Sequence, residues 1–436
     1  MEGKEFKNEP NLDLDLLPRK KSNKKKIKIL IIILIILSIL ILLLAGALIY
    51  FIFFKKDESS INNKKEEEEE TPFKPQPSGF FQFFGTKYSN LRYDENGKIY
   101  NSFKIKGENY IKEMGSINND QDYDSNELNV YDLYIPRYAE ERKNETNGIM
   151  LWIHGGWWIG GELSMTSPSC ELYSQLGYIS ANINYTLINS ENKISNIFRI
   201  LDEITASIKA IKNELIKRGF DGNKLLLSIG GVSAGAHIAL LYSYLIKDIN
   251  SIIPIKFVID LVGPIGLYEK YFYKLKSHND TLDTIENITL LEKAKEEGKI
   301  IKAVSDSWIL MLMNGFSGNK YTKEEINEMM DENGSIKYEN EKYKELFNIT
   351  KYGFITEIED KHKLPTICIY GGRDDEIGVS SYAYLKEKAD KDGRHIDYIY
   401  SRYEGHILVW YSTEDGKQSV YNMNSLIIKY LKKYFG

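Results

Sequence analysis

The sequence contains few cysteines and no large excess of charge of either sign. Only two cysteines, Cys170 and Cys368, occur among the 436 residues, and they do not form a metal-binding spacing. A disulfide between them is one alternative, but the apolar, strand-like surroundings of Cys368 favour a buried free thiol. The formal net charge of −5 excludes the strongly basic field that nucleic-acid binding needs. We therefore expect neither a metal site nor a nucleic-acid partner.

A long apolar run lies near the N-terminus. Residues 29–54 carry no charge and are long enough to span a bilayer core of about 30 Å. Basic residues are frequent within 1–28, and the acidic run Glu66–Glu70 follows the apolar segment, so the positive-inside rule places the N-terminus in the cytoplasm. The sequence predicts a basic cytoplasmic tail over 1–28, a transmembrane helix over 29–54, and a remainder that faces the lumen or the outside.

Two further features bear on this topology. Ala45-Gly46-Ala47 resembles a cleavage site, so a cleaved signal peptide is an alternative, but the apolar run continues to Phe54 and favours an uncleaved anchor. Asn184 lies at an expected strand end and is the sequon least suited to modification. Among the other Asn-x-Ser/Thr sequons after the membrane segment, four are expected as candidate glycosylation sites: Asn144, Asn279, Asn287 and Asn348.

Strands and helices alternate in the C-terminal part of the chain. A charged and Pro-containing stretch over 55–79 indicates a flexible linker, and we expect one ordered domain over 80–436. Apolar patterns predict strands at 129–135, 148–153, 178–185, 224–229, 257–262, 366–370 and 396–401. Helical periodicity or length predicts helices at 169–176, 198–218, 234–245 and 419–434. This alternation predicts an α/β fold with a mostly parallel central sheet and helices on both faces.

One interval interrupts the alternation. Residues 266–363 are far too many for an ordinary strand–helix connection, and they include amphipathic runs at 306–313 and 323–330. We interpret this inserted segment as a helical cap over the active site. A peripheral decoration without a role in substrate binding is the alternative.

A nucleophile motif lies between an expected strand and an expected helix. Gly231-Val232-Ser233-Ala234-Gly235 fits the pattern G-x-S-x-G in the strand–turn–helix context that the pattern requires. The turn is so tight that the serine adopts a strained backbone and larger neighbours clash, which explains the glycines. Ser233 is therefore the expected nucleophile, at the edge of the sheet where its strand ends.

A glycine-rich loop follows an earlier strand. His154-Gly155-Gly156-Trp157 is similar to the HGGG-type loop of lipases and esterases, in which backbone N–H groups stabilise an oxyanion. The expected donors are the N–H groups of Gly156, Trp157 and Ala234, and His154 and Gly155 support the loop. Trp157 replaces the third glycine, which leaves its N–H available but narrows the expected acyl pocket.

An acid and a base follow in the order that this chemistry requires. Asp374 and Asp375 follow a strand, and the spacing of Asp374 from Gly371 is better, so Asp375 is the fallback. Of the six histidines, His406 alone follows the serine, the acid and a last strand. The order Ser233, Asp374, His406 is the triad order of α/β-hydrolases.

Residues 127–411 resemble the esterase branch of the α/β-hydrolases. The motifs His154-Gly155-Gly156, Asn184-Tyr185 and Gly231–Ala239 look closest to those of feruloyl-esterase-like, kynurenine-formamidase-like and isoprenylcysteine-methylesterase-like enzymes. The resemblance implies the α/β-hydrolase fold, the triad named above and carboxylic-ester chemistry. It does not fix the substrate, which we expect to be a small-molecule or lipid-like ester, and we expect no metal or organic cofactor.

The functional hypothesis is a membrane-anchored serine hydrolase that cleaves carboxylic esters through an acyl-enzyme on Ser233. Amide or formamide hydrolysis and acyl transfer use the same triad and remain alternatives. A non-catalytic binding or adhesion protein is a third, but such proteins typically lack the serine or the histidine. An isoprenylated membrane substrate would suit a tether, although the expected lumenal orientation conflicts with a cytoplasmic prenylated protein.

Overall fold

Six stretches of the chain are described by the computed structural model: residues 102–106, 130–188, 196–277, 287–402, 404–406 and 414–436. The chain divides into two units, 1–71 and 72–436, and all described residues belong to the second. The expected tail, transmembrane helix and linker lie outside the described residues. No helix within those six stretches is both long and apolar enough to cross a membrane.

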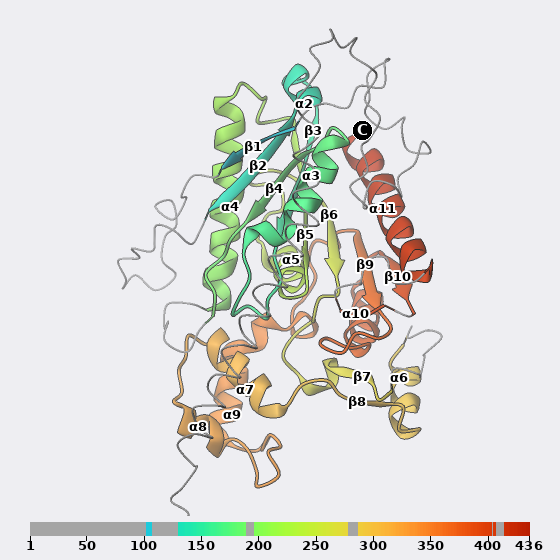
Figure 1. Ribbon diagram of the computed structural model, residues 1–436. Coiled ribbons are helices and arrows are strands. Elements are labelled where there is room, and N and C mark those ends of the chain that lie inside the picture. Colours follow the sequence, from blue (N-terminus) through green and yellow to red (C-terminus); the bar gives the residue numbers. More distant parts are fainter. Residues whose placement is uncertain (1–101, 107–129, 189–195, 278–286, 403, 407–413) are drawn as a thin grey trace, which may run out of the picture. The chain divides into compact units, whose positions relative to one another are not determined.

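An eight-stranded sheet forms the centre of the second unit (Figure 1). The strands lie in the order β1-β2-β4-β3-β5-β6-β9-β10. Strand β2 pairs antiparallel with β1 and β4, and the other neighbours pair parallel. The bounds are β1 (Ser102–Lys106), β2 (Tyr131–Pro136), β3 (Asn147–Ile153), β4 (Ile179–Ile183), β5 (Leu225–Val232), β6 (Ile255–Leu261), β9 (Thr366–Gly371) and β10 (Ile396–Ser401). The expected mostly parallel sheet is confirmed.

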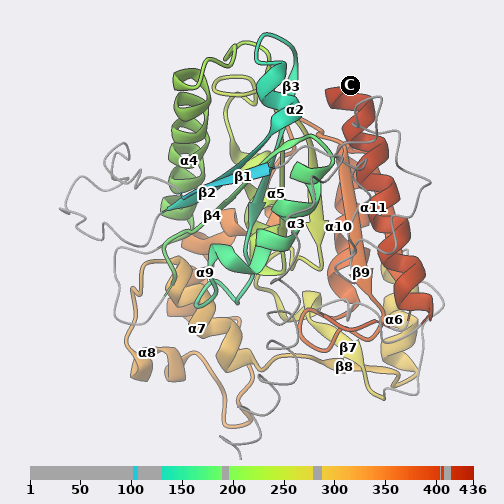
Figure 2. The ribbon, with the colours of Figure 1, turned by 45° about the horizontal axis from the view of Figure 1, so that its top comes forward.

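Helices cover both faces of the sheet, because the buried strands carry apolar side chains on both sides. In β3, Ile149 and Leu151 belong to one core, whereas Met150 and Trp152 belong to the other. Figures 1 and 2 show α4 on one side of the sheet and α11 on the other. The first core contains α4 (Ile197–Lys217), α5 (Ala234–Leu245) and α10 (Ser380–Asp392), and the second contains α3 (Ser167–Gln175) and α11 (Glu414–Phe435).

The inserted segment contains its own secondary structure. The two amphipathic runs form helices, as expected, and β7 and β8 form an antiparallel pair that the sequence did not reveal. Four helices of the segment begin at a side-chain cap, at Asn287, Ser305, Thr322 and Asn340. The elements are β7 (Tyr273–Leu275), α6 (Ile288–Glu296), β8 (Ile300–Lys302), α7 (Asp306–Phe316), α8 (Lys323–Glu328) and α9 (Glu341–Thr350).

Some elements outside the inserted segment were not expected. Helix α10 is rich in polar residues, and its amphipathic pattern is weak, with Tyr382, Leu385 and Ala389 among its buried apolar residues. The short helix α2 (Arg137–Glu141) was likewise not predicted.

Both Cys170 and Cys368 are buried and free, which confirms the thiol expected for Cys368 and excludes the alternative disulfide.

A fully buried ion pair joins the end of the inserted segment to the turn between α10 and β10. The Arg394 Nε donates to the Asp360 Oδ2 at 2.5 Å, and neither side chain is exposed. The Arg394 guanidinium also donates to Thr366 at 3.0 Å and lies 4.1 Å from the ring centre of Tyr244. The backbone N–H of Lys363 donates to the other oxygen of Asp360 at 2.9 Å. The pair is thus embedded in the hydrogen bonds and ring contact that a buried charge requires.

The Asp360→Asn substitution preserves side-chain volume but leaves the Arg394 guanidinium buried without its counter-charge. Breaking a buried ion pair in this way costs about 3–5 kcal/mol. We expect the free energy of unfolding, measured by urea denaturation, to fall by about that amount.

The matched control is Asp390→Asn, which removes the carboxylate of an exposed pair. Lys386 and Asp390 pair on the surface of α10, with side chains 33% and 63% exposed. Exposed pairs contribute about 0–1 kcal/mol. Equal destabilisation by the two substitutions would contradict the importance that we assign to the buried pair.

Candidate active site

The turn between β5 and α5 holds Ser233 in a strained backbone conformation. β5 ends at Val232, α5 begins at Ala234, and Ser233 between them has φ 55° and ψ −123°. A residue with a side chain in such a conformation stores about 1–3 kcal/mol of strain, which its surroundings must hold. The Ser233 N–H donates to the Leu261 carbonyl at 2.8 Å and ties the turn to β6. The strained strand-to-helix turn expected from the pentapeptide is confirmed.

Close backbone contacts explain the glycines around this serine. A Cβ atom on Gly235 would lie 2.2 Å from the carbonyl oxygen of Ile153 in β3. A Cβ atom on Gly231 would lie 2.3 Å from the carbonyl carbon of Gly235. Such distances are far below van der Waals contact, so any larger residue would push α5 away from the sheet. The glycines therefore let α5 begin directly behind Ser233.

The expected nucleophile, base and acid form one hydrogen-bonded chain. The His406 Nε2 lies 2.9 Å from the Ser233 Oγ, and the His406 Nδ1 lies 2.8 Å from the Asp374 Oδ2. Because a carboxylate only accepts, Nδ1 carries the proton, and Nε2 is left to accept the hydrogen of the serine hydroxyl. All three side chains are at most 8% exposed. The structure thus brings together the three residues that the sequence assigned to the triad.

The acid is held rigidly in its turn. The Asp374 Oδ1 accepts the backbone N–H groups of Glu376 and Ile377, each at 2.9 Å, which leaves Oδ2 for His406. The preceding backbone also binds the loop that carries the base, because the Arg373 N–H donates to the Glu404 carbonyl at 2.9 Å. The structure therefore selects Asp374 as the partner of the histidine, and the fallback Asp375 is an exposed neighbour.

The loop after β3 is folded by its own hydrogen bonds. The His154 Nδ1 donates to the Gly155 carbonyl at 2.8 Å, and the Gly156 carbonyl accepts the N–H groups of Ile159 and Gly160 at 3.1 and 3.0 Å. In a trans peptide the N–H points opposite to the carbonyl. These bonds therefore direct the N–H groups of Gly156 and Trp157 away from the interior of the loop.

The loop lies against the nucleophile. A Cβ atom on Gly155 would lie 3.1 Å from the Ser233 Cβ. Ala234 is the first residue of α5, and the first N–H groups of a helix have no acceptor within the helix. The loop that carries two of the expected donors thus lies against Ser233, and the third donor is the residue that follows Ser233.

Two tryptophans hold the loop in an unusual conformation. Trp157 and Trp158 both have positive φ angles, 54° and 62°, which large side chains rarely adopt. The Trp157 indole N–H donates to the Glu376 Oε2 at 2.9 Å. Trp158 is fully buried, with the rings of His237 and Phe316 at 5.2 and 5.1 Å. Both side chains therefore act as anchors for the strained loop.

The inserted segment reaches the oxyanion loop. The rings of Phe272 and Trp308 each lie 6.1 Å from the ring of Trp157, the first stacked and the second edge-on. Trp308 belongs to α7, and Phe272 precedes β7. These contacts favour the interpretation of the segment as a cap over a peripheral decoration.

The electrostatic environment differs among the three buried histidines. Burial lowers the pKa of His154, and it lowers the pKa of His237 to about 4, so both are neutral at pH 7. Burial also opposes protonation of His406, but the hydrogen bond and charge of Asp374 outweigh it, with help from Glu376 and Asp375. The pKa of His406 is therefore raised above its ordinary value, as suits a base that must hold a proton during catalysis.

Sequence reasoning missed Glu376. Its Oε2 lies 3.7 Å from the His406 Nε2, while it accepts the indole N–H of Trp157. The position, two residues after Asp374, was the available signal, but nothing local indicated that the side chain points back to the base. Glu376 adds a second carboxylate beside the histidine.

The asparagines of the expected sequons differ in their exposure to solvent. Asn144, Asn287 and Asn348 are exposed, and Asn279 lies outside the described residues. The Asn184 Oδ1 accepts the Leu163 N–H at 2.6 Å, so this side chain is already engaged, in line with its exclusion above.

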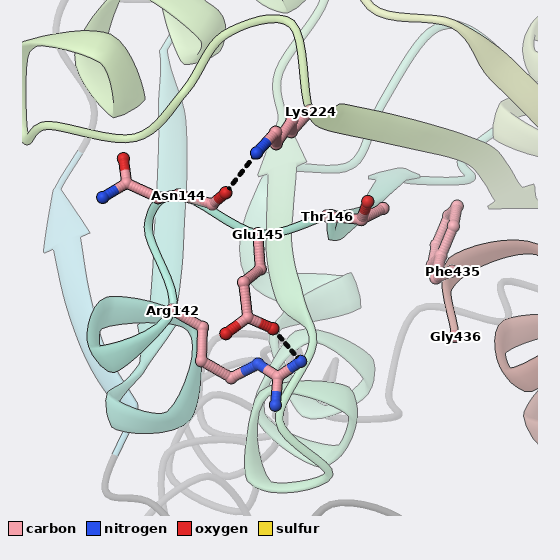
Figure 3. Close-up of a pocket in the computed structure, with 7 residues that line it drawn as sticks. All are labelled: Arg142, Asn144, Glu145, Thr146, Lys224, Phe435 and Gly436. Atoms are coloured by element: carbon pink, nitrogen blue, oxygen red, sulfur yellow. Dashed lines mark hydrogen bonds and ion pairs between the residues drawn. The ribbon is translucent and has the colours of Figure 1, made fainter.

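A hollow of about 480 Å³ is lined by Arg142, Asn144, Glu145, Thr146, Lys224, Phe435 and Gly436 (Figure 3). Thr146 and Lys224, which line it, precede the parallel strands β3 and β5, whereas Ser233 follows the end of β5. The Lys224 Nζ donates to the Asn144 carbonyl at 2.6 Å, and Arg142 pairs with Glu145. This hollow cannot serve the triad.

Known esterases of similar fold have little sequence in common with the chain. Esterase B from Lactobacillus rhamnosis is 14% identical over 79% of this chain and 91% of its own, with a TM-score of 0.47. A hyperthermophilic esterase from Pyrobaculum calidifontis is 13% identical over 80% and 90%, with a TM-score of 0.45. A bacterial heroin esterase is 14% identical over 81% and 90%, with a TM-score of 0.46. No protein of curated function matches the chain.

A family model settles what these similarities leave open. The model of the BD-FAE family matches residues 131–387, which is more than half of the chain. The match includes Ser233 and Asp374 and ends before His406. It confirms the resemblance to α/β-hydrolase esterases, and carboxylic ester hydrolysis is the enzyme class of this family. The chain therefore belongs to the BD-FAE family of α/β-hydrolase esterases.

Proposed function

We propose that the protein is a serine hydrolase that cleaves carboxylic esters through an acyl-enzyme on Ser233. The main support is the pair of hydrogen bonds, 2.9 Å and 2.8 Å long, that connects Ser233 through His406 to Asp374. This geometry lets one side chain withdraw the serine proton while another stabilises the resulting imidazolium. Family membership supports ester chemistry, and no observation favours amide hydrolysis or acyl transfer.

The reaction begins when the Ser233 Oγ attacks the ester carbonyl and transfers its proton to the His406 Nε2. The imidazolium, stabilised by Asp374, then returns the proton to the oxygen of the leaving alcohol. Water attacks the acyl-enzyme by the same route and releases the acid. No step uses a metal or organic cofactor.

The oxyanion forms beside the start of α5 and the loop after β3. We assign its hydrogen bonds to the N–H groups of Gly156, Trp157 and Ala234, each of which is worth about 100- to 1,000-fold in rate. The Trp157 ring packs against Phe272 and Trp308 and is tied to Glu376 through its indole N–H. It narrows the space beside the oxyanion loop and supports a preference for small esters.

The Ser233→Ala substitution removes the nucleophile but leaves an alanine in the turn. We expect hydrolysis of p-nitrophenyl acetate, followed by absorbance, to fall at least about 10⁴-fold, because loss of a triad serine removes the acyl-enzyme route. Ser228→Ala is the matched control. It removes a buried hydroxyl from β5, the strand before the turn, and that hydroxyl donates to the Ile149 carbonyl and not to His406 or Asp374. Wild-type turnover by the folded Ser233 variant would refute the assignment.

The pH dependence of kcat/KM should report the pKa of His406. Only its neutral form accepts the serine proton, so activity is lost as the pH falls through its pKa. Asp374 raises that pKa against the effect of burial, with Glu376 and Asp375 contributing. We therefore expect the acid limb to be centred above about 6.5, the ordinary histidine value. A limb centred clearly below that value, in a protein whose circular dichroism shows an intact fold, would contradict the proposed environment.

We further propose that residues 29–54 anchor the enzyme as a single transmembrane helix, with a cytoplasmic N-terminus. The absence of charge over this run and the basic flank before it support this topology. The catalytic domain then lies in the lumen or outside the cell, and its exposed sequons meet the glycosylation machinery.

If the domain is lumenal, the full-length protein made in eukaryotic cells should run faster on a gel after glycosidase treatment. Replacement of the exposed Asn144 and Asn348 by Gln should reduce this shift. A full-length protein whose mobility the glycosidase does not alter would count against the lumenal orientation.

A further inference from the structure

A carboxylate lies where the leaving alcohol must depart. The Glu376 Oε2 is 3.7 Å from the His406 Nε2, the atom that returns the proton to the alcohol in the proposed reaction. The side chain of Glu376 is 41% exposed, so substrate can approach it. In the proposed reaction Glu376 therefore lies beside the leaving alcohol, since that alcohol receives its proton from the His406 Nε2.

The carboxylate is held in place by a hydrogen bond, and no Lys or Arg among the described residues neutralises its charge. The indole N–H of Trp157 holds it at 2.9 Å and restrains it from turning into solvent. Glu376 contacts Trp157 and His406, and neither Lys nor Arg in the described stretches of the chain forms an ion pair with it. The neighbours Asp374 and Asp375 are also acidic. The mouth of the site thus presents a negative charge and an apolar indole side by side.

We propose that Glu376 is a specificity-determining residue that favours esters whose leaving alcohol carries an alkylated ammonium group. The proposal rests on the proposed esterase function, because the position of the alcohol follows from the proton transfer by His406. A positive charge a few ångströms from the carboxylate is attracted to it, and a negative one is repelled. The rings of Trp157 and Trp308 offer the apolar contact that alkyl groups on nitrogen require.

Two esters of matched shape test this proposal. Acetylcholine and 3,3-dimethylbutyl acetate share the acetyl group, and their leaving alcohols differ chiefly in a nitrogen replaced by carbon and therefore in charge. We expect the full-length wild type to show a kcat/KM about tenfold higher for the cationic ester. This preference should shrink when ionic strength rises from about 0.02 M to about 0.5 M, because salt screens a partly exposed charge.

In the Glu376→Gln variant an amide oxygen can still accept the Trp157 indole N–H, but the side chain carries no charge. We expect its preference for the cationic ester to fall to about twofold or less. The preference is a ratio, so a general loss of activity cancels. Asp375→Asn is the matched control, because it removes an exposed negative charge one residue earlier in the same turn. It should keep most of the wild-type preference.

Several results would overturn the proposal. A wild type that prefers the neutral ester, or a Glu376→Gln variant with the wild-type ratio, would show that the carboxylate does not select charge. An equal loss of preference in Asp375→Asn would assign the effect to the general acidity of the turn. A folded wild type that hydrolyses neither these esters nor p-nitrophenyl acetate would overturn the esterase function as well, which is a distinct outcome from hydrolysis without charge preference.

Discussion

The left-handed backbone of Ser233 is the constraint on which the catalytic half of this molecule depends. The chain must leave β5 and enter α5 within one residue, and the resulting strain is held by the hydrogen bond to Leu261 and by the close packing of Gly235 on β3. That packing requires parallel strands on both sides of β5, buried under helices. The sheet therefore serves as a rigid support that keeps a hydroxyl at its edge in one orientation.

A single turn after β9 connects the remaining parts of the site. Asp374 orients the base, and two residues later Glu376 reaches the indole of Trp157 in the oxyanion loop. The turn itself is closed by the backbone N–H groups that Asp374 accepts. Base and oxyanion loop are thus fixed relative to one another through one short stretch of backbone, which limits how far either can move independently.

The sequence predicts features whose signals are local. Ser233, the loop at His154 and the acid Asp374 each follow a recognisable strand with a characteristic short motif, and chain order then identified His406. The bond between Trp157 and Glu376 joins residues 219 positions apart, and the buried pair of Asp360 and Arg394 likewise depends on tertiary packing. Helix α10 was missed because its weak apolar pattern is compensated by contacts with other elements. Local motifs therefore predicted the three side chains that the fold brings together, whereas only the fold revealed what holds them.

The stacking of Trp157 on Phe272 has a consequence for how the inserted segment affects the site. Phe272 and Trp308 belong to the inserted segment, residues 266–363, whereas all three triad residues come from outside it. A change in that segment can accordingly reach the proposed oxyanion loop through Trp157 without altering any of the three side chains that form the hydrogen-bonded chain. The surroundings of the substrate are therefore built from two stretches of the chain, with Phe272 and Trp308 from the inserted segment and Trp157 and Glu376 from outside it.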